Sequence, residues 1–343
     1  MHYFITGHTG FKGSWLALWL HQNGFRVSGF SLDPDPGSLF ERANLTDIME
    51  IDERSDIREG AALRSSIEEA KPDVVVHMAA QPLVRESFRD PRSTVEVNVL
   101  GTMNVLEAVS RVPSVQAQVI VTTDKVYRNI GQVTGYVEDD ALGGSDPYSA
   151  SKAMADLLTH AWTSSFDLPP TAVVRAGNVI GGGDISKDRL LPDLLDAFSA
   201  GEVPEIRYPS AVRPWQHVLD CLAGYRTLID RMLHIDAPQH DWGAWNFGPD
   251  QESIVTVGDI ASRVAKLWQA SSEWNQTVPE FNEASLLILD SSKARNELGW
   301  RSRLTLDQAL LKTVEWEQQV RDGADPREVT AAQIDWYIQR LFE

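Results

Sequence analysis

A glycine-rich turn between a strand and a helix constrains this chain more than any other feature. A run rich in aromatic and β-branched residues at 2–6 leads into Gly7, Gly10 and Gly13, and a helical pattern begins at Ser14. Glycines at these positions allow a tight turn and a close backbone approach to a pyrophosphate, while the helix N-terminus offers free N–H groups. The spacing G-x-x-G-x-x-G departs from the usual G-x-G-x-x-G, but its place at a strand–helix junction predicts a dinucleotide site.

Strands and helices are expected to alternate along the first half of the chain. Short apolar runs predict buried strands, and apolar residues repeating every three or four positions predict helices. The expected strands are residues 2–6, 26–31, 73–77, 118–121 and 172–175, and the expected helices are 14–23, 61–70, 94–109 and 147–162. This alternation predicts an α/β fold built on a doubly wound parallel sheet, the Rossmann architecture.

The alternation breaks after Asn178, where glycines and irregular polar stretches follow. No linker rich in Pro, Gly or Ser marks a boundary there, so we expect two interleaved domains. A helix at 218–233 and a strand at 245–247 would return to the sheet, and helices at 257–268, 291–298 and 306–319 would form a smaller, mostly α lobe. The expected domains are a nucleotide-binding domain of residues 1–178 plus about 212–248 and a substrate-binding domain of about 179–211 plus 249–343.

Composition excludes several classes of function. The 343 residues include 43% hydrophobic residues, enough for a sizeable core, and carry a net charge of −18, which disfavours nucleic acid and anionic membrane surfaces. A single cysteine, Cys221, excludes an internal disulfide and a cysteine metal cluster, and the eight histidines show no metal spacing. No apolar run could span a bilayer and no signal-peptide core opens the chain, so we expect a cytoplasmic enzyme without a metal.

A second motif, Tyr-x-x-x-Lys, lies at Tyr148 and Lys152. Pro147 suits the first position of a helix and Asp146 can cap it, which puts Tyr148 and Lys152 one turn apart on the same face. A phenol has a pKa of about 10, and a neighbouring ammonium together with a nicotinamide cation would favour the phenolate and lower that pKa. The motif is common on helices, but after a nucleotide-binding turn it predicts a proton acceptor for an oxidised hydroxyl.

Three polar residues, Thr123, Asp124 and Lys125, follow the expected strand at 118–121. The carboxyl ends of parallel strands are where doubly wound sheets place ligands, so Thr123 can hydrogen-bond a substrate hydroxyl beside Tyr148. A bare redox step needs no further acid or base, so the added Asp-Lys pair suggests further proton transfers. The alternative is a solvated turn without a chemical role.

These motifs resemble those of the extended short-chain dehydrogenase/reductases that act on nucleotide sugars, and most closely those of CDP-glucose 4,6-dehydratases. The resemblance covers nearly the whole chain. Its most specific matches are residues 7–16 (GHTGFKGSWL) and 213–219 (RPWQHVL), and further matches lie at 77–85, 123–125, 175–184, 289–294 and 298–300. It implies a lyase with a nucleotide-sugar substrate and NAD, in which hydride passes from C4 to NAD, water is lost across C5 and C6, and hydride returns to C6.

The resemblance also implies roles for individual residues. Tyr148 would take the C4-hydroxyl proton, Asp124 would protonate the departing 6-hydroxyl, and Lys125 would take the C5 proton. Related dTDP-sugar dehydratases carry Asp-Glu where this chain has Asp124-Lys125, so the roles within this pair stay open. The residues expected near the nucleotide diphosphate are Asn178, Arg189 and Arg213.

Cofactor contacts are expected around the turn and the following strand ends. The residues implied are Gly7, Gly10, Phe11, Gly13, Asp56, Ile57, Ala79, Ala80, Asn98, Tyr148 and Lys152. An acidic residue about twenty positions after the turn would read the adenosine ribose, but Asp33 stands two residues late and leaves Ser31 at that position. No arginine follows to receive a 2′-phosphate, so the pattern favours NAD and leaves NADP open.

Two expected helices carry apolar stripes that suggest a homodimer. One stripe is Val95, Val99, Met103 and Leu106, and the other is Met154, Leu157, Leu158 and Ala161. Relatives pair two such helices per subunit into a four-helix bundle; alternatively, both stripes simply cover the sheet.

Two other functions fit part of the pattern. A nucleotide-sugar 4-epimerase, or a 4,6-dehydratase of a dTDP-, UDP- or GDP-hexose, would use the same fold, but an epimerase needs no acid and base beside Thr123. A non-catalytic nucleotide-sensing protein would have little reason to keep Thr123, Tyr148 and Lys152 together.

Overall fold

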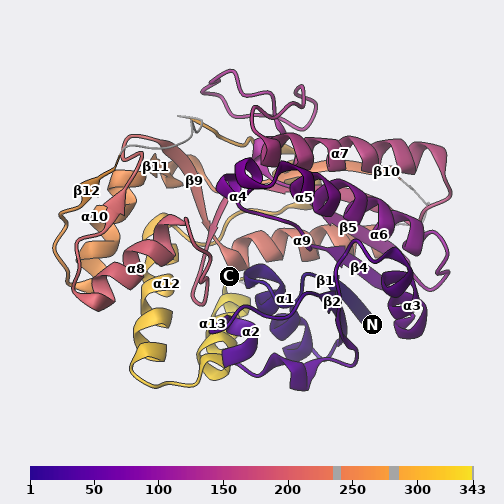
Figure 1. The fold of residues 1–343 in the computed structure, drawn as a ribbon, viewed down its shortest axis with the longest axis horizontal. Helices are drawn as coiled ribbons and strands as arrows, with labels where there is room; N and C mark the ends of the chain where they lie inside the picture. Colours follow the sequence, from indigo (N-terminus) through magenta and orange to yellow (C-terminus); the bar gives the residue numbers. More distant parts are fainter. Residues whose placement is uncertain (235–240, 278–285, 342–343) are drawn as a thin grey trace.

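The computed structural model describes residues 1–234, 241–277 and 286–341. Its centre is a seven-stranded parallel sheet in the order β10-β6-β5-β4-β1-β2-β3 (Figure 1). The strands are β1 (His2–Thr6), β2 (Arg26–Ser31), β3 (Asp52–Arg54), β4 (Val74–His77), β5 (Ala117–Val121), β6 (Thr171–Ala176) and β10 (Asp241–Phe247). The order reverses after β1, so the predicted doubly wound α/β sheet is confirmed.

Helices cover both faces of this sheet. Alternate side chains of the strands point to opposite faces, so Ile5 packs toward α1 (Phe11–Gln22) and α9 (Val218–Leu233), whereas Phe4 packs into the opposite cluster. The opposite face is covered by α3 (Gly60–Ala70), α6 (Gly101–Val109) and α7 (Pro147–Ser165). Both faces are therefore buried, which explains the continuous apolar runs of the strands.

The helix expected at 94–109 is interrupted and begins earlier. It consists of α5 (Pro91–Val95), a π-helical turn η2 (Glu96–Leu100) and α6, with Asp90 capping the first turn through a hydrogen bond from Ser93 N. The apolar pattern predicted the element but not the wider turn, which side-chain periodicity does not reveal. Short helices α2 (Leu39–Arg42), η1 (Leu45–Ile48) and α4 (Val84–Arg89) connect neighbouring elements.

A smaller lobe lies to one side of the sheet, on the left of Figure 1. Its apolar cluster is formed by α8 (Leu190–Ala200), α10 (Val257–Trp268) and α12 (Leu306–Arg321) together with β9 (Val212–His217). β9 pairs with β7 (Asn178–Ile180) and β11 (Ile254–Thr256), and β8 (Glu205–Ile206) pairs with β12 (Asn275–Gln276). The sequence analysis expected irregular chain where α8 and β9 form.

The remaining C-terminal elements return to the sheet. They are α11 (Ser292–Leu298) and α13 (Pro326–Leu341), which join the cluster around α1 and α9; the 3-10 helices η3 (Asp124–Val126) and η4 (Gln251–Ser253) lie in connections. Asp220 of α9 is buried among these C-terminal segments. Its carboxylate accepts hydrogen bonds from Tyr337 Oη at 2.7 Å and from Ser302 Oγ at 2.7 Å. A buried carboxylate with several donors therefore holds these C-terminal segments against α9.

Candidate active site

The turn after β1 is shaped by two glycines. Gly7 has a φ of +76°, and a Cβ on it would lie 2.7 Å from the backbone nitrogen of Ala79. A Cβ on Gly13 would lie 2.2 Å from the carbonyl oxygen of Gly7. Helix α1 begins at Phe11, three residues earlier than expected, and no side chain in the described residues caps it. Its first N–H groups are therefore available to an anion.

The loop after β4 is held against this turn by buried polar groups. The Thr6 hydroxyl lies 2.7 Å from His77 Nδ1 and accepts from the backbone N–H of Ala79 at 3.2 Å. Asn98 braces the same loop, because it accepts from Gln81 N at 2.8 Å and donates to Ser151 Oγ at 2.8 Å. Asn98 thus links the cofactor side of the fold to α7.

The other expected cofactor contacts lie at the ends of β2 and β3. Ser31 Oγ is 2.7 Å from Thr9 Oγ1 and therefore sits beside the glycine turn. Ile57 is buried, and the Asp56 carboxylate accepts from Arg58 Nη2 at 2.7 Å. Asp33 is exposed in the connection after β2.

Tyr148 and Lys152 lie one turn apart in α7, and both are buried. Asp146 caps this helix, as expected, by accepting from Ser149 N at 2.9 Å. Lys152 Nζ donates to the carbonyl of Val121 at 3.0 Å. Burial and then the charge of Lys12 lower the pKa of Lys152 to about 7.

In the free protein, the pKa of Tyr148 is raised. Burial raises it to about 12, although a hydrogen bond with Thr123 opposes the shift. A buried phenolate is costly without a nearby positive charge. Lys152 supplies only part of such a charge at neutral pH, because its own pKa is lowered to about 7. The lowering expected from the sequence includes the charge of a nicotinamide cation as well as that of the lysine.

An acid stands directly beside this pair. Asp124 is buried, and its Oδ1 accepts from Thr123 Oγ1 at 2.9 Å. Its other oxygen, Oδ2, has no hydrogen-bond partner among the described residues. Burial raises the pKa of the Asp124 carboxyl, which favours the protonated acid. Lys125 is partly exposed next to it.

A cavity of about 310 Å³ brings most of the predicted site residues together. Thr123, Asp124, Lys125, Tyr148 and Lys152 line it, and so do Ala80, Asn178, Arg189 and Arg213. The predicted cofactor residues outside its lining are Gly7, Gly10, Phe11, Gly13, Asp56, Ile57, Ala79 and Asn98. One cavity therefore combines a tyrosine, an amine, a buried carboxylic acid and two arginines, a set suited to proton transfer on an anionic substrate.

Known proteins are similar in sequence to this chain over most of its length. A family model described as GDP-mannose 4,6 dehydratase matches residues 4–313. The chain belongs to this family. A CDP-glucose 4,6-dehydratase of Salmonella typhimurium is 44% identical over 347 residues, which cover 98% of this chain and 95% of that protein. The resemblance inferred from the motifs is thereby confirmed.

Solved structures agree with this family membership. The dTDP-glucose 4,6-dehydratase of Bacillus anthracis, in complex with NAD, matches with a TM-score of 0.80 at 25% identity and covers 95% of this chain and 99% of that chain. The UDP-glucuronic acid 4-epimerase of Bacillus cereus, in complex with UDP-glucuronic acid and NAD, matches with a TM-score of 0.82 at 23% identity, over 93% and 100%. The second match supports the fold alone.

The sequence analysis missed several charged residues of the site in this 4,6-dehydratase family member. Lys12 lines the cavity with its Nζ 3.4 Å from Tyr225 Oη, and burial lowers its pKa. Arg85, Asp188 and Arg207 also line the cavity. The only sequence signal was a charged residue inside the glycine turn; the other three look like ordinary surface charges.

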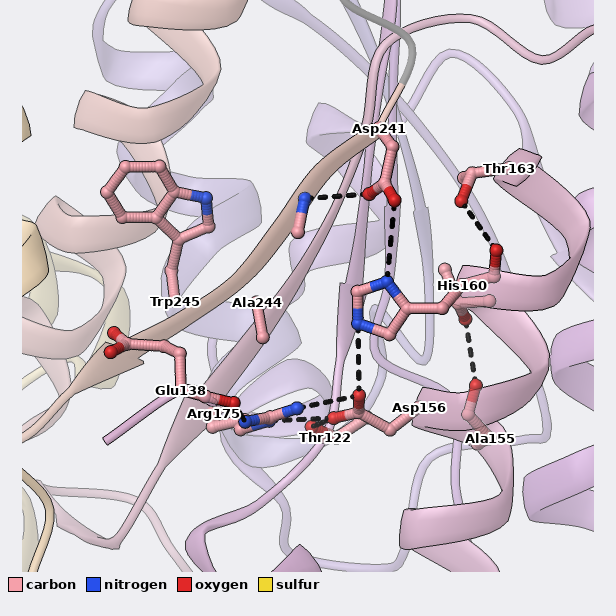
Figure 2. A network of polar contacts seen from close by, with 12 residues as sticks. Thr122, Glu138, Ala155, Asp156, His160, Thr163, Arg175, Asp241, Ala244 and Trp245 are labelled. Carbon is pink, nitrogen blue, oxygen red and sulfur yellow. Dashed lines mark hydrogen bonds and ion pairs between the residues drawn. The ribbon is translucent and has the colours of Figure 1, made fainter. Parts of the chain in front are cut away.

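A buried ion pair anchors the helix that carries Tyr148 and Lys152. Figure 2 shows Arg175 of β6 lying along the carboxylate of Asp156, one turn beyond Lys152; Nε and Nη2 donate to its two oxygens at 2.8 Å each. Arg175 Nη1 also donates to the carbonyl of Glu138 at 2.9 Å. This pair fixes the position of α7 on the sheet.

No helix of the described residues combines the length and hydropathy that crossing a bilayer would require. Within the same residues, no group of three or more His, Cys, Asp or Glu side chains could hold a metal ion.

Proposed function

We propose that this chain is a CDP-glucose 4,6-dehydratase, a lyase that uses NAD catalytically and releases water. The observation that carries the proposal is the buried Asp124 carboxyl beside Tyr148 and Lys152 in one cavity. An epimerase needs no such acid, and the 44% identical Salmonella protein bears the name of this activity.

The residues around the glycine turn fit a dinucleotide. Gly7 and Gly13 let the turn pack directly against the backbone of Ala79 and of Gly7 itself, which a Cβ at either position would prevent, and Thr9 and Ser31 offer hydroxyls beside this turn. We assign NAD because no arginine directly follows β2 to bind a 2′-phosphate. When bound, the cofactor would supply a hydride acceptor for C4 of the sugar and, once reduced, a hydride donor for C6.

Tyr148 is assigned to the C4 hydroxyl. Its phenol takes the hydroxyl proton while hydride leaves C4, and Thr123 orients that hydroxyl. The raised pKa of Tyr148 makes the phenolate unfavourable in the free protein, so this step requires a positive charge in the cavity. Lys152, whose amine is held by the Val121 carbonyl, orients the cofactor and supplies part of that charge when protonated.

Asp124 and Lys125 are assigned to the loss of water. The 4-keto group acidifies the C5 proton, which a base removes, and Asp124 delivers a proton to the departing 6-hydroxyl. The raised pKa of Asp124 keeps a proton available for this step. Lys125 is the base in this assignment, and it returns a proton to C5 once C6 has received the hydride. Asp124 regains its proton from solvent, which takes up the C4-hydroxyl proton from Tyr148, so the net change is the loss of one water molecule.

The diphosphate is assigned to Asn178, Arg189 and Arg213, which line the same cavity as Tyr148. An arginine guanidinium can donate two parallel hydrogen bonds to phosphate oxygens, which would hold the sugar in position next to Tyr148. This arrangement gives residues 1–178 plus about 212–248 to the cofactor and about 179–211 plus 249–343 to the nucleotide sugar.

We further propose a cytoplasmic homodimer formed by α5, η2, α6 and α7. Leu106 is buried against the sheet, so part of the predicted stripe serves the core. Met154, Leu157 and Leu100 remain 40%, 55% and 45% exposed, an apolar face that a second copy would cover in a four-helix bundle.

The test is incubation of the protein and NAD with CDP-, dTDP-, UDP- and GDP-glucose, followed by product mass. We expect CDP-glucose to yield a product one water lighter, without net NADH. Conversion of dTDP-glucose but not CDP-glucose would overturn the nucleotide assignment, and an isomer of unchanged mass would favour the epimerase. Binding without turnover would favour a nucleotide sensor.

A further inference from the structure

A fixed charged cluster forms one wall of the cavity, where α4 meets the smaller lobe. Asp188, which precedes α8 and has a φ of +62°, accepts from Arg85 Nη1 at 2.9 Å and from Arg207 Nη1 at 2.7 Å. Arg207 Nη2 also donates to the backbone carbonyl of Asp188 at 3.0 Å. The guanidinium of Arg207 is therefore held in one orientation on the cavity wall.

A second carboxylate stands near this cluster. Asp193 lies in the first turn of α8 and lines the same cavity. Within the described residues, its carboxylate makes no hydrogen bond or ion pair, although Arg207 and Arg85 exert a favourable charge on it. The Asp193 carboxylate, a free acceptor, and the Arg207 guanidinium, a donor held in one orientation, thus both line this cavity.

The position of this pair matches the nucleoside end of the substrate. Tyr148 and Asp124 define the sugar end, at the edge of the large sheet, and Arg213 and Asn178 follow for the diphosphate. Asp193 and the segment after β8 belong to the smaller lobe, at α8 in Figure 1. For a nucleotide sugar whose C4 hydroxyl reaches Tyr148, we assign the base to this wall of the same cavity.

Cytosine differs from uracil and thymine along one edge of its ring. It carries an amino group, a hydrogen-bond donor, where uracil and thymine carry a carbonyl oxygen, and carboxylates accept readily from that amino group. The cytosine ring nitrogen and carbonyl next to it are acceptors, which suit a guanidinium. A carboxylate facing the carbonyl of uracil would instead place two acceptors together.

We propose that Asp193 and Arg207 read cytosine, with Asp193 accepting from the exocyclic amino group and Arg207 donating to the ring nitrogen or its adjacent carbonyl. This inference rests on the proposed function and assigns its nucleotide selectivity to two residues. Asp188 and Arg85 act as positioning residues, because they hold Arg207 in place.

The pKa of Asp193 offers an independent readout. Asp193 is open to the cavity, yet partial desolvation raises the pKa of its carboxyl to about 6; Arg207 and Arg85 oppose this shift, and Asp188 and Asp196 add to it. Protonation removes an acceptor, so the preference for CDP over UDP should fall between pH 7.5 and pH 5.5.

The test is calorimetric binding of CDP and UDP to the full chain, with Asp193→Asn beside the wild type. An amide can either accept or donate, so we expect the ratio of the CDP to the UDP affinity to fall by roughly ten- to a hundredfold. The pH dependence of that ratio should disappear in the variant. Arg207→Met should weaken CDP binding while leaving thermal stability close to that of the wild type.

Two matched variants complete the test. Asp196→Asn removes another carboxylate of α8, one that is paired with Arg321. Glu205→Gln removes another carboxylate of the cavity wall. Neither variant should change the ratio of the CDP to the UDP affinity. An unchanged ratio in Asp193→Asn, or a change only in Glu205→Gln, would overturn the inference. If CDP-glucose is still turned over in that case, the proposed function stands and only the cytosine inference fails. If Asp193 confers selective CDP binding but CDP-glucose is not turned over, the cytosine inference stands and the proposed function fails.

Discussion

Burial acts in opposite directions on the two central residues of the site. It raises the pKa of the Tyr148 phenol to about 12 and lowers the pKa of the Lys152 ammonium to about 7, because each charged form is disfavoured away from water. In the free protein above neutral pH both groups are therefore uncharged. A positive charge beside Tyr148 would lower the pKa of its phenol, so we expect proton transfer to Tyr148 to be easier with a cationic cofactor bound.

Replacement of Tyr148 by phenylalanine tests the proton acceptor. Tyr148→Phe removes one oxygen from a buried ring, so the variant should fold and lose roughly 10²- to 10⁴-fold in turnover. The measurement is kcat with CDP-glucose, together with a thermal unfolding curve as a check on folding. Turnover within a few-fold of the wild type would contradict the assignment.

Asp124→Asn separates oxidation from dehydration. The amide cannot protonate the 6-hydroxyl, so the reaction should stop after C4 oxidation, with NADH absorbance and a 4-keto-glucose product that has not lost water. In deuterated water the wild type should place deuterium at C5. Unimpaired dehydration by both Asp124→Asn and Lys125→Met would show that the acid and base lie elsewhere.

The lowered pKa of Lys152 predicts a pH-dependent stability. An unfolded lysine binds its proton up to a pKa of about 10.4, whereas folded Lys152 releases it near pH 7, so the unfolded state binds more protons between these values. The free energy of unfolding should therefore rise with pH from about 7 to 10. Lys152→Met should show a flatter rise in chemical denaturation, and parallel pH profiles would contradict the prediction.

At the scale of elements, α7 depends on its buried ion pair. Asp156→Asn leaves the Arg175 charge buried without its partner, which should lower the free energy of unfolding by about 3–5 kcal/mol in urea denaturation. Arg26→Gln is the matched control, since it breaks an exposed pair with Glu50 and should cost at most about 1 kcal/mol. Equal losses in the two variants would refute the anchoring role.

The sequence predicted elements best where one pattern dominated. The strand–turn–helix at Gly7 and the capped helix at Pro147 were found because glycine geometry and N-capping act locally. Helix α8 was missed although its leucines repeat with helical spacing, since glycines and charges before it suggested irregular chain. The edge strand β3 (Asp52–Arg54) was missed because its three polar residues show no apolar alternation.

The site residues also divide into those that a local sequence pattern predicted and those that it did not. Motif residues such as Thr123, Tyr148 and Lys152 were placed correctly in one cavity, because strand ends and helix faces follow from local pattern. Arg85, Asp188 and Arg207 were not, since they come from three separate segments that only the tertiary fold brings together. The burial that raises the pKa of Tyr148 in the free protein likewise depends on the surrounding packing.

At the scale of the whole molecule, the exposed apolar face of α7 predicts self-association. Leu157 and Met154 point away from the sheet while Tyr148 and Lys152 of the same helix are buried, so one helix would serve both the interface and the site. Burying such side chains gains about 25 cal/mol per Å², which a charged substituent forfeits. Leu157→Lys should therefore shift the protein from dimer to monomer in sedimentation velocity. Ile130→Lys, at a side chain 73% exposed in the connection before α7, should leave the dimer unchanged; an unaltered dimer in Leu157→Lys would place the interface elsewhere.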